Sequence, residues 1–406
     1  MVIPPFKPRD LSPSQNRKTL KSYLGTLIQK TLELSANIGK ILGIPIRIHW
    51  TLWLVFLLIA WSLADGYLPA VYPGLGAATY WAIGAVSAFL LFISVLLHEL
   101  SHSYIAKKNG LPIARITLFF FGGVSEMSEE PKDAGLEVRM ALAGPLTSFA
   151  IAGVLGALWF VSRLISAPVP IIAVLGYNAV INVALGAFNL VPAFPLDGGR
   201  VLRGSLWGRS KNLLKATRNA TRVSEALSLI MIAAGLLLVV ATADIFNGLW
   251  IIFLGWFIRS GAETSLKQTE MTEALHGISV GDIMTRDLLT VSPDISVQKL
   301  VTDYFLIHPH GGYPVVRNDK LEGVVTMSSV RSIPAEKREM ETVAQAMVPY
   351  DRIVTISPNS SAADALRKIA EKNIGRLLVT DGDKILGMIT RGDLMKTIRT
   401  RQDLSL

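Results

Sequence analysis

A His-Glu-x-x-His pattern is the strongest chemical signal in the sequence. His98, Glu99 and His102 end an apolar stretch in the segment FISVLLHELSHSYIAKKNG. Residues i and i+4 of a helix lie on one face, so both imidazoles can reach one metal ion while Glu99 lies beside it as a base. Ionisable residues at the end of an apolar helix indicate function by default. The alternative is that these side chains only reach the membrane interface.

A third ligand is needed, because catalytic zinc sites use three protein ligands and keep one open position. The chain has no cysteine, so this ligand must offer oxygen or nitrogen. Asp197 is the candidate, within NLVPAFPLDGGR, where two prolines interrupt the end of an apolar stretch. Broken backbone at membrane depth is tolerated where it lines a cavity. Taken alone, PLDGG also fits a turn in which Asp197 caps the next helix. Its pairing with the histidine motif favours the ligand.

The elements that must position these residues are apolar stretches in the first two-thirds of the chain. Of the 406 residues, 50% are hydrophobic and 17% are charged, whereas soluble proteins average about 25% charged residues. This composition argues against a soluble or disordered protein. Six stretches approach the length that crosses a bilayer: roughly 50–65, 78–100, 137–162, 170–191, 224–242 and 246–259.

The positive charge of the chain follows the predicted loops. The net charge is +9, and Lys and Arg gather before the first span and after the second and fourth spans. The first and fifth loops have neither, and the third has only Arg163. By the positive-inside rule, we expect a multi-pass protein of a bacterial or archaeal cell membrane with both termini cytoplasmic. Topology explains the basic excess, so nucleic acid is not an expected partner. Residues 1–48 would be cytoplasmic, with Ser14 to Leu34 either a helix on the membrane surface or a disordered tail.

The two motifs together resemble those of the site-2 protease family, the intramembrane zinc metalloproteases of peptidase family M50. The segments GIPIRIHW and ITLFFFGGVSEM add to a resemblance that covers about residues 40–260. It implies that His98, His102 and Asp197 bind one zinc ion, that Glu99 is the general base, and that Asn189 contacts substrate or the oxyanion. It also implies a six-helix protease domain, residues 49–262, that cleaves single-span, membrane-tethered regulatory proteins in the lipid bilayer near its cytoplasmic face.

A β-prone segment follows the histidine motif. Residues 113–124 are rich in β-branched and aromatic side chains and end near two glycines, in a stretch too short to span as a helix. We predict a strand or a re-entrant hairpin here. Its open edge could pair with an unwound substrate by β-augmentation. If so, proline or a charge between Thr117 and Phe121 would abolish cleavage without removing zinc.

The C-terminal region is an internal repeat. SVGDIMTRDLLTVSPD (279–294) matches TVAQAMVPYDRIVTISPN (342–359), and KLEGVVTMSSV (320–330) matches KILGMITRGDL (384–394). Such a repeat indicates tandem units that bury a shared surface. The pattern resembles a pair of CBS domains, here residues 263–335 and 336–406. The expected fold class is therefore a polytopic α-helical membrane protein with a C-terminal α/β tandem CBS domain.

The CBS resemblance also implies a ligand. Gly387, Thr390 and Asp393 match the family's Gly-x-x-Thr-x-x-Asp motif for the ribose and phosphate of an adenine nucleotide, ATP or AMP. The first repeat keeps the glycine and Thr326 but has Ser329 in place of the acid. We therefore expect one competent cleft and one degraded cleft. The alternative is a pair that serves only as a platform for homodimers.

Two other functions compete with a protease. A CBS-regulated channel or transporter would suit polar residues in spans beside a nucleotide sensor. It leaves HELSH and PLDGG unexplained, and the first three spans do not repeat in the last three, as carriers often do. An inactive relative acting as a scaffold is a further possibility, against which the intact ligands and base argue.

Overall fold

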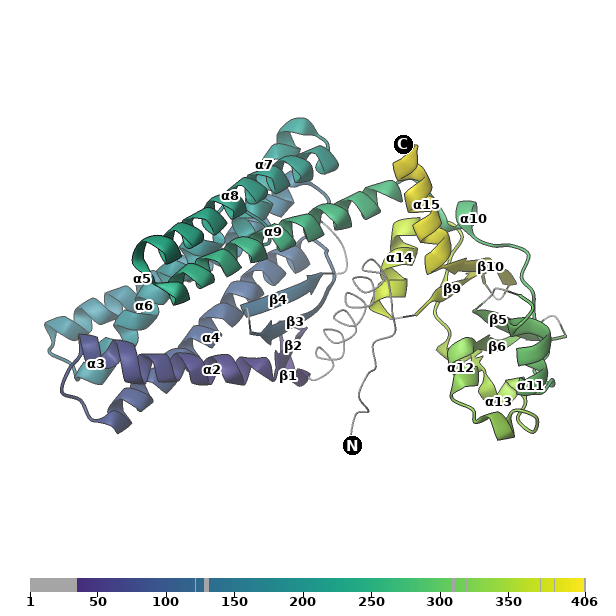
Figure 1. Cartoon of the computed structure of the whole chain (residues 1–406), viewed down its shortest axis with the longest axis horizontal. Coiled ribbons are helices and arrows are strands. Elements are labelled where there is room, and N and C mark those ends of the chain that lie inside the picture. The colour runs from purple at the N-terminus through teal and green to yellow at the C-terminus, as the bar shows by residue number, and fades with distance from the viewer. Residues whose placement is uncertain are drawn as a thin grey trace. The chain divides into compact units, whose positions relative to one another are not determined.

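The chain forms two compact units, Met1–Leu266 and Lys267–Leu406, whose elements are labelled in Figure 1. The computed structural model describes residues 35–404, apart from residues 121, 128–130, 309, 310, 319, 373 and 383. The helix expected between Ser14 and Leu34 therefore lies outside the described residues.

Six apolar segments among the described residues are long enough to cross a bilayer. This confirms the predicted number of spans, although several helices run well beyond the apolar stretch that predicted them. The first comprises α2 (Thr51–Ser62), a π-helical turn (Leu63–Tyr67) and α3 (Leu68–Val71); the others are α4 (Ala77–Lys108), α5 (Ala134–Leu164), α6 (Val169–Asn189), α8 (Leu213–Thr242) and α9 (Ile245–Ala274).

Polarity in these helices is the reverse of that in a soluble bundle. Large apolar side chains face outward, with Val240 84% and Phe246 80% exposed. Small and polar residues are buried instead, as at Ser94 and Asn182, where the Asn182 amide donates to the Ser94 hydroxyl at 3.1 Å and joins α6 to α4. Lipid solvates the outer face, and helices associate through close packing and hydrogen bonds. This pattern of exposed apolar and buried polar side chains is typical of a membrane-spanning unit.

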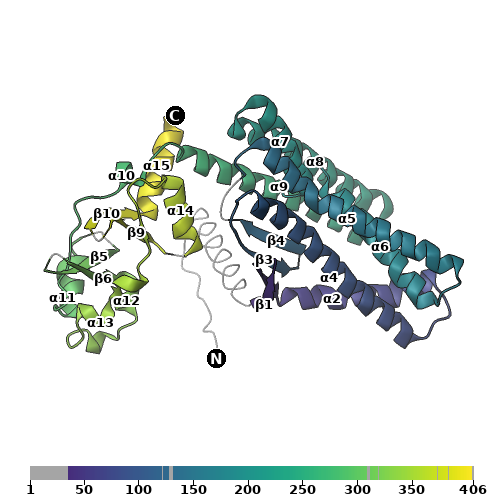
Figure 2. The ribbon, with the colours of Figure 1, turned by 180° about the vertical axis from the view of Figure 1, so that it is seen from behind.

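A four-stranded sheet packs beside α4 (Figure 2). Its order is β1 (Ser35–Ile41), β2 (Ile44–His49), β3 (Ile113–Phe119) and β4 (Gly122–Met127). Strands β2 and β3 are parallel, and the other pairs are antiparallel. Strands β3 and β4 form an antiparallel hairpin where a strand or a re-entrant hairpin was expected, but β3 has a partner on both sides. Within the described part of the chain, the open edge next to β3 therefore belongs to β4 and not to the Thr117–Phe121 stretch, of which Phe121 is not described.

The PLDGG segment turns the chain sharply after α6. A short loop containing a cis Phe194–Pro195 peptide leads into α7 (Asp197–Ser210). A Cβ atom on Gly198 would lie 2.3 Å from the carbonyl oxygens of both Leu190 and Val191. Only glycine lets the loop approach the helix start so closely. Asp197 is thereby the first residue of α7.

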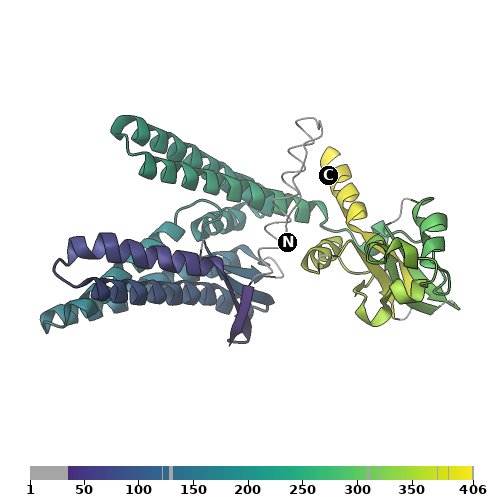
Figure 3. The same ribbon diagram turned by 60° about the horizontal axis from the view of Figure 1, so that its bottom comes forward.

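Helices α8 and α9 run side by side as an antiparallel pair (Figure 3). Their contact depends on small residues, since a Cβ atom on Gly235 would lie 2.7 Å from the carbonyl oxygen of Gly248. Close approach through glycine is a common device for packing helices in lipid.

The second unit contains two three-stranded sheets, β5-β6-β7 and β10-β9-β8, which confirms the tandem α/β fold. The strands are β5 (Gly312–Arg317), β6 (Lys320–Thr326), β7 (Val348–Pro349), β8 (Thr355–Ile356), β9 (Arg376–Asp381) and β10 (Lys384–Thr390). The helices are α10 (Val280–Ile283), α11 (Val297–Leu300) with a π-helical turn (Val301–Phe305), α12 (Met327–Arg331), α13 (Val343–Ala346), α14 (Ala362–Glu371) and α15 (Arg391–Asp403), and 3-10 turns cover Ala335–Lys337 and Tyr350–Arg352.

The two repeats exchange their leading segments. Leu275 and Val280, which precede the first repeat's strands, are buried in the core of the second repeat. Val343, which begins the second repeat, is buried in the core of the first. Each packed core therefore contains residues from both sequence repeats.

Candidate metal centre

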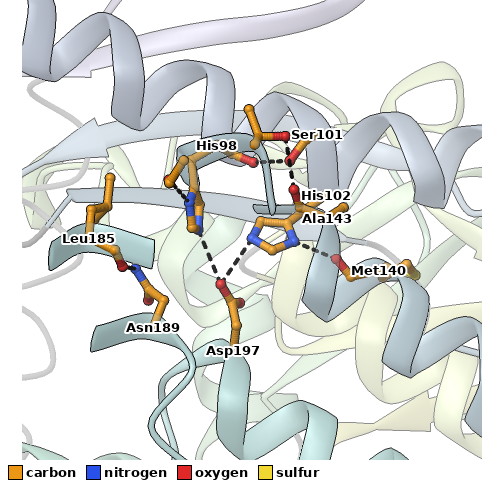
Figure 4. A network of polar contacts seen from close by, with 10 residues as sticks. His98, Ser101, His102, Met140, Ala143, Leu185, Asn189 and Asp197 are labelled. Atoms are coloured by element: carbon orange, nitrogen blue, oxygen red, sulfur yellow. Dashed lines mark hydrogen bonds and ion pairs between the residues drawn. The ribbon is translucent and has the colours of Figure 1, made fainter. Parts of the chain in front are cut away.

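The three predicted ligands meet at one point (Figure 4). His98 and His102 project from successive turns of α4, and the Nε2 atoms lie 3.1 Å and 3.2 Å from Oδ2 of Asp197. The three ligand atoms all lie within 4.8 Å of one another. Two imidazoles and a carboxylate offer the nitrogen and oxygen donors that a catalytic zinc site uses.

Hydrogen bonds to the other ring nitrogens orient both histidines. His102 Nδ1 donates to the carbonyl oxygen of Met140 at 2.6 Å, and His98 Nδ1 lies 2.9 Å from the Ser148 hydroxyl. Because a carbonyl only accepts, the Nδ1 of His102 carries the proton and Nε2 keeps its lone pair for a metal. Nε2 of His102 is buried and makes no hydrogen bond of good geometry. These residues fit a zinc ion.

Helix α5 forms a cradle against the histidines. A Cβ atom on Gly144 would lie 2.2 Å from His102 Nε2 and 2.4 Å from His98 Nε2. The helix can approach the ligand atoms only because residue 144 has no side chain. The motifs alone do not point to Gly144; the one available signal is a Gly-Pro pair in the third span with a serine one turn later.

Glu99 lines the same cavity, which has a volume of about 360 Å³. Strand β4 passes close to it, since a Cβ atom on Gly123 would lie 2.3 Å from Cγ of Glu99. The cavity therefore joins the candidate base, the candidate ligands and the strand with the open edge. Much of its wall is aromatic: Phe119, Phe188, Trp250, Phe253 and Phe257.

Asn189 is the last residue of α6 and also lines the cavity. Its amide Nδ2 donates to the carbonyl oxygen of Leu185 at 2.9 Å. This bond uses one of the two N–H groups of the amide. The second N–H group can donate to a group bound in the cavity.

Asp197 lies at the start of α7, where its Oδ2 atom faces the Nε2 atoms of both His98 and His102. Helix α7 is tied to α5 by a buried ion pair in which Arg203 Nε donates to Glu137 Oε1 at 2.6 Å. The Arg203 guanidinium also lies 5.6 Å from the ring centre of Phe194. Neither contact is visible in the sequence motifs.

The candidate nucleotide residues of the second unit bond mainly to one another. The backbone N–H and hydroxyl of Thr390 donate to Asp393 Oδ2 at 2.9 Å and 2.7 Å, and the Asp393 N–H donates back to the Thr390 hydroxyl at 3.2 Å. This is a capping box at the start of α15. Thr326 accepts from the N–H of Ser329 at 3.2 Å in the same position of the first repeat. The Thr-x-x-Asp spacing therefore has a local structural role.

Gly387 has a role in packing between the repeats. A Cβ atom there would lie 2.5 Å from the carbonyl oxygen of Thr285, and Thr285 and Met388 exchange two backbone hydrogen bonds of 2.9 Å. Glycine at this position lets a segment of the first repeat join the edge of β10.

Known proteins match both units. The model of peptidase family M50 matches residues 86–167 and 165–238, and the CBS domain model matches residues 280–336 and 343–400. Zinc metalloprotease MJ0392 of Methanocaldococcus jannaschii is 35% identical, over 90% of this chain and 97% of that protein. Rip3 of Mycobacterium tuberculosis is 33% identical, over 89% of this chain and 92% of that protein.

A solved structure of the site-2 protease from M. jannaschii is 36% identical, covers 57% of this chain and 95% of that chain, and has a TM-score of 0.38. The matches over nearly the whole chain define the class: a membrane metalloprotease with a CBS pair. The chain belongs to peptidase family M50, the site-2 proteases, and is a zinc metalloprotease. The resemblance seen in the sequence is confirmed, and a channel or transporter is not supported.

Proposed function

We propose that the chain cleaves single-span, membrane-tethered regulatory proteins within the bilayer, with His98, His102 and Asp197 holding one zinc ion. The observation that carries this proposal is the convergence of three ligand atoms within 4.8 Å in a cavity that also contains Glu99. When bound, zinc supplies Lewis-acid polarisation of the scissile carbonyl and activates water.

The chain's own residues perform the remaining tasks. The Glu99 carboxylate takes a proton from the attacking water and passes it to the leaving amine. The Met140 carbonyl and the Ser148 hydroxyl keep the imidazoles oriented. The aromatic walls hold an apolar segment away from bulk water, and the second N–H group of Asn189 donates to a substrate carbonyl.

Glu99→Gln tests the catalytic base directly. We expect this variant in liposomes to retain one zinc ion and to lose cleavage of a tagged single-span substrate, because an amide cannot accept the proton. His102→Ala or a chelator should remove both zinc and cleavage. Glu263→Gln, which changes an exposed carboxylate on α9, is the matched control and should cleave normally. Cleavage by Glu99→Gln at the wild-type rate would refute the assignment.

We infer that the metal site lies near the cytoplasmic face of the cell membrane, with both termini cytoplasmic. The basic loops support this topology, since positive loops stay inside. The chain has no cysteine, so one cysteine introduced in the fifth loop or at either terminus is a unique label site. In intact cells, an impermeant thiol reagent should label only the fifth loop. Labelling of the termini would reverse the topology.

Strand β4 is the proposed docking edge for an unwound substrate. Among the described residues it is paired on one side only, and Gly123 brings it against Glu99. Single prolines along Gly122–Met127 should block substrate pairing where they remove an outward N–H group, while zinc remains bound. Prolines in β1, the edge strand at the other end of the sheet, are the control. Equal cleavage by both sets would exclude strand pairing.

The CBS pair is the proposed regulatory module, binding ATP or AMP at Asp393 and forming a homodimer. The match of both repeats to the CBS family supports this part. Asp393→Asn is the informative variant, since asparagine keeps a capping oxygen and removes the charge. Calorimetry should show weaker nucleotide binding with unchanged stability. If the wild-type chain binds no nucleotide, the CBS pair would serve only as a dimerisation platform. Sedimentation of the protein in detergent measures its oligomeric state separately.

A further inference from the structure

Arg200 lies in the wall of the catalytic cavity but has no part in the proposed metal binding or proton transfer. It follows Asp197 by three residues on α7, so both side chains project from the same face of that helix. The cavity that contains His98 and Glu99 is lined by Arg200 as well. Its side chain is exposed, and α7 is not one of the six apolar segments. Arg200 therefore lies on an exposed part of the wall, outside the six apolar segments.

The contacts of Arg200 contrast with those of Arg203, one turn further along α7. Arg203 is buried and paired with Glu137. Within the described residues, no hydrogen bond or ion pair engages Arg200, which lines the same cavity as Glu99. Arg203 therefore joins α7 to α5, whereas the guanidinium of Arg200 faces the cavity.

The charges of the site leave Arg200 uncompensated. Asp197 and Glu99 contribute two negative charges, which balance the two positive charges of a bound zinc ion. This count rests on the proposed function. An ion's own charge must be included in any such balance, and Arg200 then adds one positive charge with no counterpart. A negatively charged group on the substrate would supply it.

We propose that Arg200 determines specificity by binding an Asp or Glu side chain of the substrate next to the scissile bond. The planar guanidinium matches a carboxylate with two parallel hydrogen bonds. Its exposure assigns it to a flanking side chain and not to the reacting carbonyl, which would be bound among ligand side chains that are 5% to 16% exposed. Lysine or arginine at the same substrate position is repelled.

Binding measured in the Glu99→Gln protein tests this proposal without cleavage. The probes are three single-span peptides in nanodiscs, identical except for Glu, Gln or Lys at the three positions flanking each end of the apolar segment. An exposed ion pair gives the Glu peptide an advantage of about fivefold over the Gln peptide. The Lys peptide binds more weakly, and added salt reduces the differences.

Variants on α7 separate recognition from folding. Arg200→Gln should remove the preference, and Arg200→Glu should reverse it in favour of the Lys peptide, which a misfolded variant cannot do. Arg209→Gln is the matched control, because it changes an exposed arginine of α7 outside the cavity wall. The preference should survive there.

Two results would overturn the proposal: an unchanged preference in Arg200→Gln, or an equal loss of affinity for all three peptides, which would indicate a contact with the substrate backbone. Cleavage of the same peptides by the zinc-loaded wild type is a separate readout. Charge-dependent binding without cleavage would contradict the proposed proteolysis but support the role of Arg200 in binding an acidic side chain.

Discussion

The candidate metal site of the first unit and the Thr-x-x-Asp motif of the second unit were both singled out by sequence motifs, and they differ in where their contacts come from. His98 and Asp197 are 99 residues apart and meet through α4 and α7. Helix α5 adds the Met140 carbonyl and Ser148. Thr390 and Asp393 instead bond to each other within one helical turn.

The difference shows how far a motif supports a function. Helix capping explains Thr390 and Asp393 without any ligand. No local rule brings three ligand atoms together from two helices, with a glycine of a third helix leaving room for them. Convergence of distant residues is therefore stronger evidence for a binding site than a matched spacing.

The largest effect is expected at Gly144. Gly144→Ala would place a methyl group 2.2 Å from His102 Nε2, so we expect loss of both bound zinc and cleavage. Gly153→Ala is the control on the same helix, because a Cβ atom there meets nothing within 4 Å. Metal analysis of the purified variants measures the outcome. One zinc ion per chain in Gly144→Ala would show that α5 is not a cradle for the site.

A smaller effect is expected at Ser148, which contacts a ligand and not the metal. Ser148→Ala removes the hydroxyl 2.9 Å from His98 Nδ1, and losses of such partners weaken metal binding by about 10- to 100-fold. Competition with a chelator measures the affinity. Thr147→Ala is the control, since that hydroxyl donates to the Ala143 carbonyl of its own helix. Equal affinities for the two variants would contradict an orienting role.

In the second unit, Gly387→Ala should destabilise the packing between the repeats. The added methyl group would meet the carbonyl oxygen of Thr285 at 2.5 Å, and overpacking of this kind costs about 1–3 kcal/mol. Hydrogen exchange of β9 and β10 in the intact protein should become faster, with zinc content unchanged. Gly375→Ala is the control, because a Cβ atom on Gly375 meets nothing within 4 Å. Hydrogen exchange of β9 and β10 in this variant should be as slow as in the wild type.

The smallest effect is expected for the capping box. Asp393→Ala removes the acceptor for the Thr390 N–H and hydroxyl, and loss of a cap costs about 1 kcal/mol. Exchange at the first turn of α15 should rise, whereas Asp393→Asn should remain close to wild type. If the alanine variant leaves exchange unchanged but abolishes nucleotide binding, the motif is a ligand site and the contrast with the metal centre disappears.

Several features of the fold and site could be predicted from the sequence because they depend on near neighbours. The i, i+4 spacing places His98 and His102 on one face, and the length of apolar stretches marks the six spans. The open strand edge was misplaced, because pairing of β3 with β2 depends on residues far apart in the chain. The approach of Gly144 to the histidines, the role of Ser148 and the Glu137–Arg203 pair were missed for the same reason.

What the sequence by itself determined was the chemical content of this protein: two histidines, an acid beside them, a distant PLDGG segment, six apolar stretches and a repeated α/β module. Each of these features can be read from residue types and from the spacing of residues that lie close together in the chain. Only the tertiary structure decided which aspartate oxygen faces both imidazoles, which glycine makes room for them, which arginine faces the cavity, and which repeat buries Leu275. Those outcomes depend on how whole helices and strands pack, and packing is a property of many distant contacts acting together.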